Sequence, residues 1–167
     1  MPKTHWGIQL DLIILNMFEK KRLLFFISFV SILILNSSYN TPTEGKHCIT
    51  INFESVRNKK GRIQVQIYRN SESFKAETPW KTRYVSKAEL NNGKVTFKIY
   101  NIPTGTYGIA LLDDENRNAK MDYSWLVPTE GFGFSDYYHT ALSKPKFSDF
   151  KFNLNSHKSV TMKVRYL

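Results

Sequence analysis

The sequence predicts an all-β fold: an antiparallel β-sandwich of about seven strands, formed by residues 47–167 of the 167-residue chain. Three observations support this prediction. In short segments every second residue is apolar, which is the period of a half-buried strand. Turn signals such as Asn91-Asn92-Gly93 separate these segments. After residue 40 no segment has a sustained helical period, and only Ser86–Leu90 has the composition of a single helical turn.

The expected strands follow the apolar alternation. The first two are joined by a polar turn at residues 57–61, so we expect them to pair as a hairpin with one apolar face. The fifth is apolar or small on both faces, which indicates a central strand. The seven segments are residues 49–53, 63–67, 84–85, 95–99, 107–112, 150–154 and 160–166. The residues expected in the core are Ile51, Val65, Phe97, Ile109 and Val164.

Residues 1–38 have the features of a targeting segment. Residues 20–22 are basic, Leu23–Leu35 is an apolar run of 13 residues, and small polar residues follow. This is the layout of a secretory signal peptide, and the run is shorter than the ~20 apolar residues that span a bilayer. We expect translation to start at Met17 and residues 39–46 to form a linker. The mature protein would then be periplasmic, cell-surface or extracellular, without a transmembrane span. Retention of the run as an N-terminal anchor is the alternative.

The chain is basic. Its 24 Lys and Arg residues against 14 acidic residues give a formal net charge of +10. Four of these basic and two of these acidic residues lie in residues 1–38, so the remainder carries +8. Such a surface suits weak attraction to anionic polymers, for example an acidic polysaccharide, although a solvated surface without a partner has the same composition. The lysines are scattered and no nucleic-acid-binding motif occurs, so we expect no nucleic-acid partner; another envelope protein is a further candidate.

Cys48 is the one cysteine, so the domain has no intramolecular disulfide. A catalytic thiol needs a nearby base, and the adjacent His47 would point to the opposite face of a strand. Ser135, Asp136 and His139 match no known spacing of a catalytic triad. We therefore predict no catalytic residues.

Residues 113–122, DDENRNAKMD, concentrate acidic residues in this basic chain. Oxygen-bearing side chains recur at alternate positions from Asp114, which is the spacing of EF-hand-type calcium loops. The predicted ligands are the side chains of Asp114, Asn116, Asn118 and Asp122 and the backbone carbonyl of Lys120. Asp113 or Glu130 could supply a further carboxylate. The only cofactor predicted is therefore calcium.

Two residues of this loop depart from the calcium-binding pattern. Ala119 stands where the sharp turn prefers glycine, and Trp125 stands where a bidentate glutamate would be expected. The alternative is a polar loop whose Asn and Asp side chains cap their own turns. Downstream, Trp125, Phe132, Phe134, Tyr137 and Tyr138 form either a binding surface or a core beneath a long loop.

The segment from Ile102 to Ser135 resembles the bacterial family called domain of unknown function 2141. It contains a P-x-G-T-Y turn, a D-E-N-x-N-x-K-x-D loop and a P-x-E-G-x-G-F-S tract, in the order found in that family. The resemblance covers residues 47–167 and implies an exported protein with an immunoglobulin-like or transthyretin-like sandwich, but no activity. This sequence has Arg117 and Ala119 where the family usually has glycines, and Asp113 where histidine is common.

These observations favour an exported, non-enzymatic binding or structural module with a calcium-binding loop. Two alternatives stay open. One is an envelope-associated enzyme or an accessory to a hydrolase, which would need convergent acid, base or nucleophilic groups in a pocket. The other is a basic module that binds anionic surface polymers.

Overall fold

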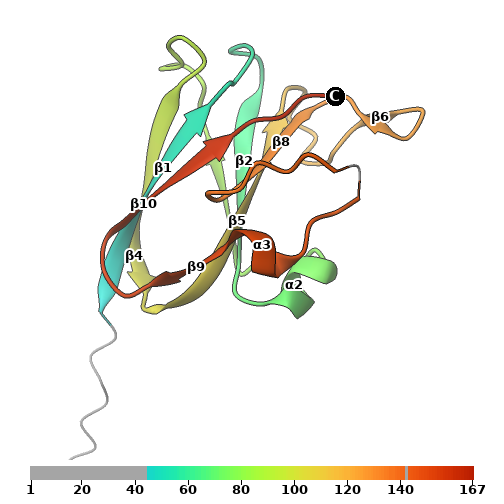
Figure 1. The fold of residues 1–167 in the computed structure, drawn as a ribbon. Coiled ribbons are helices and arrows are strands. Elements are labelled where there is room, and N and C mark those ends of the chain that lie inside the picture. The colour runs from blue at the N-terminus through green and yellow to red at the C-terminus, as the bar shows by residue number, and fades with distance from the viewer. Residues whose placement is uncertain (1–44, 142) are drawn as a thin grey trace, which may run out of the picture. The chain divides into compact units, whose positions relative to one another are not determined.

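A computed structural model describes residues 45–141 and 143–167, which form an all-β sandwich (Figure 1). The predicted fold class is confirmed. The expectations for residues 1–38, and for all but the last two residues of the 39–46 linker, lie outside the described residues. In the part of the chain that is described, no helix is long and apolar enough to cross a membrane.

Two main sheets make up the sandwich, and β6 and β7 form a separate hairpin. The first sheet has the order β10-β1-β4; the second has the order β3-β2-β5-β8, with β9 also pairing β5. The strands are β1 (Lys46–Glu54), β2 (Arg62–Tyr68), β3 (Lys81–Val85), β4 (Val95–Pro103), β5 (Gly105–Asp114), β6 (Tyr123–Ser124), β7 (Val127–Pro128), β8 (Gly131–Phe134), β9 (Lys151–Leu154) and β10 (Lys158–Lys163). Two short helices, α2 (Ser71–Lys75) and α3 (Phe147–Phe150), lie in the connections.

The expected hairpin between the first two strands is wrong. β1 pairs antiparallel with β4 and parallel with β10, whereas β2 pairs with β3 and β5. Residues 55–61 therefore cross from one sheet to the other, and the apolar faces of β1 and β2 meet in the core between the sheets. The alternation of apolar residues is the same in both arrangements, so it predicts faces but not partners.

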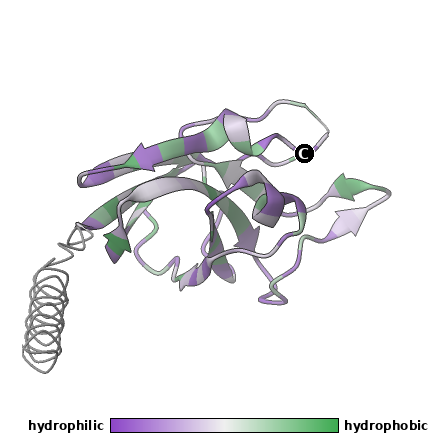
Figure 2. Cartoon of the chain, turned by 90° about the horizontal axis from the view of Figure 1, so that it is seen from below, coloured by the Kyte–Doolittle hydropathy of each residue, from purple (hydrophilic) through white to green (hydrophobic). Residues whose placement is uncertain are grey.

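The main core lies between the two sheets, and Figure 2 shows these two layers from below. Its fully buried members include Ile49, Ile51, Phe53, Ile63, Val65, Ile67, Ile109 and Met162. Four of the five predicted core residues are buried, but Phe97 is only partly buried. Its strand β4 is the edge of its sheet, so one side of the ring has no neighbouring strand.

β5 is a central strand, as predicted. One side pairs with β2, and the other pairs with β9 at Gly105–Gly108 and with β8 at Ala110–Asp113. Its outer face is covered by a second cluster consisting of Tyr68, Phe74, Ala110, Phe134, Phe147 and Phe150. A Cβ atom at Gly108 would lie 2.6 Å from the ring of Phe150, so glycine allows α3 to pack closely there.

The connections differ from the sequence-based expectations. Residues 70–83 contain α2 and the start of β3. Ser86–Leu90 contains a turn but no helix. Phe150 belongs to α3, so the following strand begins one residue later, at Lys151. These short elements depend on aromatic packing against the sheet rather than on a local period, as the contact of Phe74 with Phe150 shows.

Replacing Ile109 with Ala should lower the free energy of unfolding by about 2–5 kcal/mol, because the side chain is fully buried and its loss leaves a cavity. Chemical denaturation monitored by far-ultraviolet circular dichroism measures this change. Leu126→Ala is the matched control, since that side chain is exposed and should change stability by less than about 0.5 kcal/mol. Equal effects of the two substitutions would contradict the assigned core.

Candidate functional site

The acidic loop begins at the end of β5, where two aspartates occupy opposite faces of the strand. Asp113 continues the inward row of Ile109 and Leu111, and Asp114 lies on the outer face opposite Arg62. Both carboxylates are fully buried. Gly61 makes room for the start of the loop: it has φ +66°, and a Cβ atom there would overlap the backbone oxygen of Asp114.

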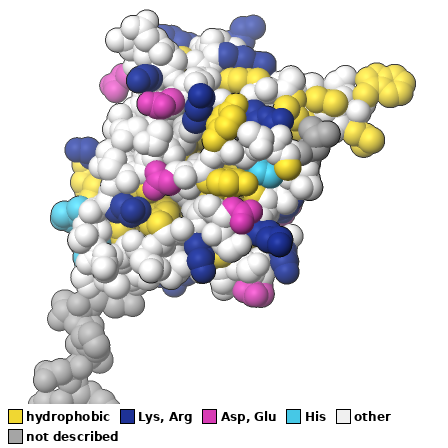
Figure 3. Space-filling model, in the orientation of Figure 1, with side chains coloured by type: hydrophobic (Ala, Val, Ile, Leu, Met, Phe, Trp, Pro, Cys, Tyr) yellow, Lys and Arg dark blue, Asp and Glu magenta, His cyan; other side chains and the backbone are white. Residues whose placement is uncertain are grey.

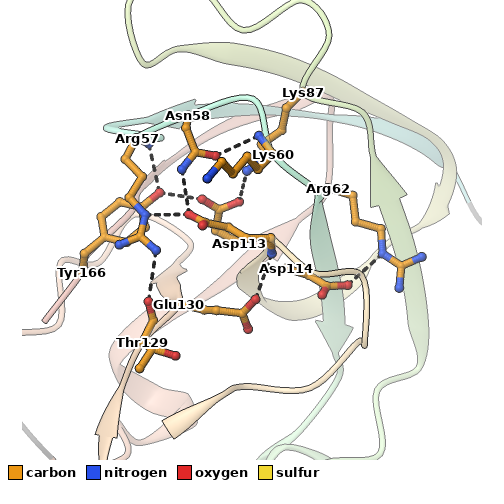
Figure 4. Close-up of polar contacts among 11 residues, drawn as sticks. Arg57, Asn58, Lys60, Arg62, Lys87, Asp113, Asp114, Thr129, Glu130 and Tyr166 are labelled. Atoms are coloured by element: carbon orange, nitrogen blue, oxygen red, sulfur yellow. Dashed lines mark hydrogen bonds and ion pairs between the residues drawn. The ribbon is translucent and has the colours of Figure 1, made fainter. Parts of the chain in front are cut away.

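Asp113 is neutralised inside the core (Figure 4). Its Oδ1 lies 2.5 Å from the buried ammonium group of Lys87, and its Oδ2 accepts a hydrogen bond of 2.6 Å from the Tyr166 hydroxyl. Burial and this hydrogen bond raise the pKa of Tyr166 above its usual range. Both carboxylate oxygens of Asp113 are thus already bonded, and the residue acts as a structural anchor.

Asp114 has one bonded and one unsatisfied oxygen. Its Oδ2 lies 2.8 Å from Nε of Arg62 and accepts a hydrogen bond from the backbone of Ala119. Its Oδ1 is buried without a hydrogen-bond partner among the described residues. Arg62 also donates to the backbone oxygen of Arg117, which holds the loop against β2.

Glu130, which lies across the loop, also has one bonded and one unsatisfied carboxylate oxygen. It is 5% exposed, and its Oε1 accepts a hydrogen bond of 2.9 Å from the backbone of Glu115. Its Oε2 is buried and has no hydrogen-bond partner within residues 45–141 and 143–167. Burial raises the pKa of Glu130, and the negative charges of Asp122 and Asp114 raise it further. The carboxylates of Asp122 and Asp114 therefore disfavour the charged form of Glu130 at this end of the sandwich.

The rest of the loop is closed by its own side chains. Oδ1 of Asn116 accepts from the backbone of Asn118, and Oδ1 of Asn118 accepts from the backbone of Lys120. Both asparagine amide groups donate to the carboxylate of Asp122, at 2.5 Å and 3.0 Å. This is the self-capping arrangement that the sequence left open. A cation could use both amide oxygens only after the two amide groups turn.

The acidic side chains alone do not assemble a metal site. Among the residues that the structure describes, no group of three or more His, Cys, Asp and Glu side chains is placed to hold a metal ion. A calcium ion would therefore need amide and backbone oxygens besides carboxylates, as EF-hand-type loops provide.

A family model described as an uncharacterized protein conserved in bacteria, domain of unknown function 2141, matches residues 51–163. The chain belongs to this family. The match extends from β1 to β10 and includes the acidic loop. No curated protein and no solved structure matches the chain.

Two residues of the loop that are not glycine adopt the left-handed backbone conformation. Arg117 and Ala119 have φ angles of 66° and 62°. L-residues adopt this left-handed conformation at a cost of about 1–2 kcal/mol each, which glycine avoids.

Ser135 and Asp136 serve the fold in this family member. The Ser135 hydroxyl accepts from the backbone of Ile109 and donates to the backbone oxygen of Phe150, joining β5 to α3. Asp136 accepts a hydrogen bond of 2.8 Å from the backbone of Thr161. The ring of His139 bonds the backbone oxygen of Ser143. The aromatic residues divide, with Phe134 buried in the second cluster and Trp125 exposed.

The partners of the acidic residues are mostly not signalled by the sequence. Lys87 lies in a turn without periodicity, and nothing in its neighbourhood signals a buried lysine. Tyr166 continues the alternation of the last strand, which did signal an inward side chain. Arg57 contacts Glu115 at 2.6 Å and lies over the ring of Tyr166, but it comes from a turn more than 50 residues upstream.

Ala119→Gly should raise the free energy of unfolding by about 1 kcal/mol, because glycine relieves the left-handed strain. Ala76→Gly is the matched control: Ala76 has φ −78°, so glycine there should lower stability by about 0.5–1 kcal/mol. Urea denaturation of both variants measures the difference. A loss of stability at both positions would show that residue 119 is not strained.

Proposed function

We propose that this protein is an exported, non-enzymatic binding module whose acidic loop binds calcium through the carboxylates of Asp114 and Glu130, together with amide and backbone oxygens. Its sandwich serves as a rigid frame for the loop. The observation that supports the proposal is the pair of buried carboxylate oxygens, Asp114 Oδ1 and Glu130 Oε2, that have no hydrogen-bond partner in the described part of the chain.

Unsatisfied buried carboxylate oxygens are expensive, so proteins retain them where a ligand can satisfy them. Calcium prefers carboxylate and carbonyl oxygens and accepts 6–8 of them in irregular geometry. Here Asp114 can keep Arg62 on Oδ2 while its Oδ1 faces the ion. Asn116 and Asn118 would turn their amide oxygens inward, and water would complete the coordination. The positive ion would offset the negative charge that Asp114 and Asp122 place near Glu130.

The expected affinity is weak, with a Kd of about 10⁻⁴–10⁻³ M, as in extracellular calcium modules. Calcium at ten times Kd should stabilise the fold by about 1.4 kcal/mol, since it binds only the folded state. Thermal denaturation in calcium and in chelator measures this effect, with magnesium giving a smaller shift. Identical melting curves in calcium and in chelator would contradict the proposal.

Glu130→Gln should abolish the calcium effect and raise stability in chelator. The pKa of Glu130 is raised, so its protonated form favours the folded state and this stabilisation is lost as pH rises through the folded-state pKa. The gain from Glu130→Gln should therefore be small below the usual pKa of glutamate and grow at higher pH. Gln can still accept the hydrogen bond from the Glu115 backbone.

Glu89→Gln is the matched control for this variant, because it makes the same chemical change at an exposed glutamate in a turn. It should leave both the calcium effect and the pH dependence unchanged. If Glu130→Gln melts like the wild type in chelator at neutral pH and still responds to calcium, Glu130 is not a ligand.

A lysine-lined groove supports a second candidate function, the binding of an anionic surface polymer. The groove lies between α2 and residues 144–151 and has a volume of about 480 Å³. Its lysines are Lys75, Lys144, Lys146 and Lys151, and Phe74 and Phe147 also line it. Lys144 is held there by hydrogen bonds to Phe74 and Glu77. Lysine side chains gathered along a groove raise the local concentration of an anionic polymer such as an acidic polysaccharide.

For this candidate, the double variant Lys146→Gln/Lys151→Gln should weaken binding to polygalacturonate about three- to tenfold at low salt. The control Lys60→Gln/Lys98→Gln removes the same charge from exposed positions outside the groove. Calorimetric titration at two salt concentrations compares them, and added salt should weaken the wild-type interaction. An equal loss in both double variants would show that only net charge matters.

A further inference from the structure

Residues 123–128 form a hairpin that projects from the sandwich, hereafter the Trp125 hairpin (Figure 1, Figure 3). β6 and β7 pair through Tyr123 with Pro128 and Ser124 with Val127, which leaves Trp125 and Leu126 at the tip. The side chains of Trp125 and Leu126 are 95% and 93% exposed. Figure 3 shows the apolar tip extending beyond the rest of this face.

The tip is unfavourable for the isolated protein in two respects. Trp125 and Leu126 have φ angles of 50° and 72°, a left-handed pair that two-residue hairpin turns normally fill with Asn and Gly. Asn-Gly would relieve this strain and would also remove the exposed apolar surface. Strained residues that also expose apolar surface mark a functional contact rather than a structural one.

The stem of the Trp125 hairpin is anchored, so the tip is carried on an ordered support. The backbone oxygen of Asp122 accepts a hydrogen bond of 2.9 Å from Thr129, which extends the ladder below β6 and β7. The guanidinium group of Arg57 donates to the backbone oxygen of Thr129.

Charges next to the stem are arranged with cations outward. Arg117 and Lys120, in the loop that leads into β6, are exposed, whereas Arg57 is paired with Glu115, and Asp122 at the base of the stem is half-buried. The carboxylates of Asp114 and Glu130 at the same end are buried. The exposed charges of the loop beside the stem are therefore positive.

We propose that the Trp125 hairpin docks the protein on an anionic lipid bilayer, with Trp125 and Leu126 inserted at the level of the headgroups and upper acyl chains. Tryptophan and tyrosine favour this interface because their rings are apolar with a polar edge, and Tyr123 stands next to the tip. Arg117 and Lys120 attract anionic headgroups. A narrow projecting tip can enter a deformable lipid layer, whereas a protein partner would need a matching pocket. This docking does not depend on calcium.

The test uses the full chain with Trp6→Phe and Trp80→Phe, so that Trp125 is the one tryptophan. Vesicles of phosphatidylcholine and phosphatidylglycerol, with brominated acyl chains in a parallel sample, are added in the presence of chelator. Emission from Trp125 should shift to shorter wavelength and be quenched by the bromine atoms. Vesicle binding of the whole chain is not a sufficient readout, because the apolar run Leu23–Leu35 can also bind lipid. The emission of Trp125 reports on the tip itself.

Leu126→Ser should weaken the Trp125 response at least about tenfold in lipid concentration. Tyr100→Ser is the control, since Tyr100 is exposed on β4, and should leave the response unchanged. The double variant Arg117→Ser/Lys120→Ser should weaken the Trp125 response on anionic vesicles. Added salt should also weaken the response of the wild-type protein on these vesicles. An equal response on vesicles of phosphatidylcholine alone would show that negatively charged lipid is not required. That result would overturn the proposal of an anionic bilayer. If the emission of Trp125 stays unchanged on all vesicles, the proposal is overturned. The tip would then be expected to fit a pocket of a protein partner.

Discussion

The buried ion pair between Lys87 and Asp113 is the interaction on which this end of the molecule depends. Two charges inside a protein core are tolerated only as a bonded pair, and removal of one partner typically costs about 3–5 kcal/mol. Asp113 also accepts from Tyr166, whose hydroxyl in turn accepts from the backbone of Arg57. One carboxylate thus joins the connection after β3, the end of β5, the C-terminal segment and the crossing between the sheets.

This anchor gives two adjacent aspartates different environments. Because neighbouring residues of a strand point to opposite faces, fixing Asp113 inside the core places Asp114 on the outer face beside Arg62. The inner carboxylate is fully bonded, whereas Asp114 and Glu130 on the loop side each keep one buried oxygen without a partner in the described residues. The loop also holds Arg117 and Ala119 in a left-handed conformation. Unsatisfied oxygens and strain that remain beside a satisfied network are expected of a binding site.

Much of the fold follows from the sequence, because side-chain period determines which face of a strand is buried. The alternation predicts Ile51, Val65 and Ile109 in the core, and all three are fully buried. The pairing of β1 with β10 rather than β2 could not be predicted, since both arrangements bury the same faces. At the site, the D-x-N-x-N spacing located the loop and its turns. The partner of Asp113 was not predictable, because a lysine is ordinarily a surface residue and only the tertiary fold buries Lys87.

The central claim is that the two unsatisfied oxygens beside this anchor face a cation. A crystal structure of the protein grown in saturating calcium tests it most directly. The account predicts one ion within about 2.3–2.6 Å of Asp114 Oδ1 and Glu130 Oε2, with the amide oxygens of Asn116 and Asn118 turned toward it. Arg62 should stay on the other oxygen of Asp114. A loop that keeps both asparagine amides donating to Asp122, with only water at the two carboxylate oxygens, would contradict the account.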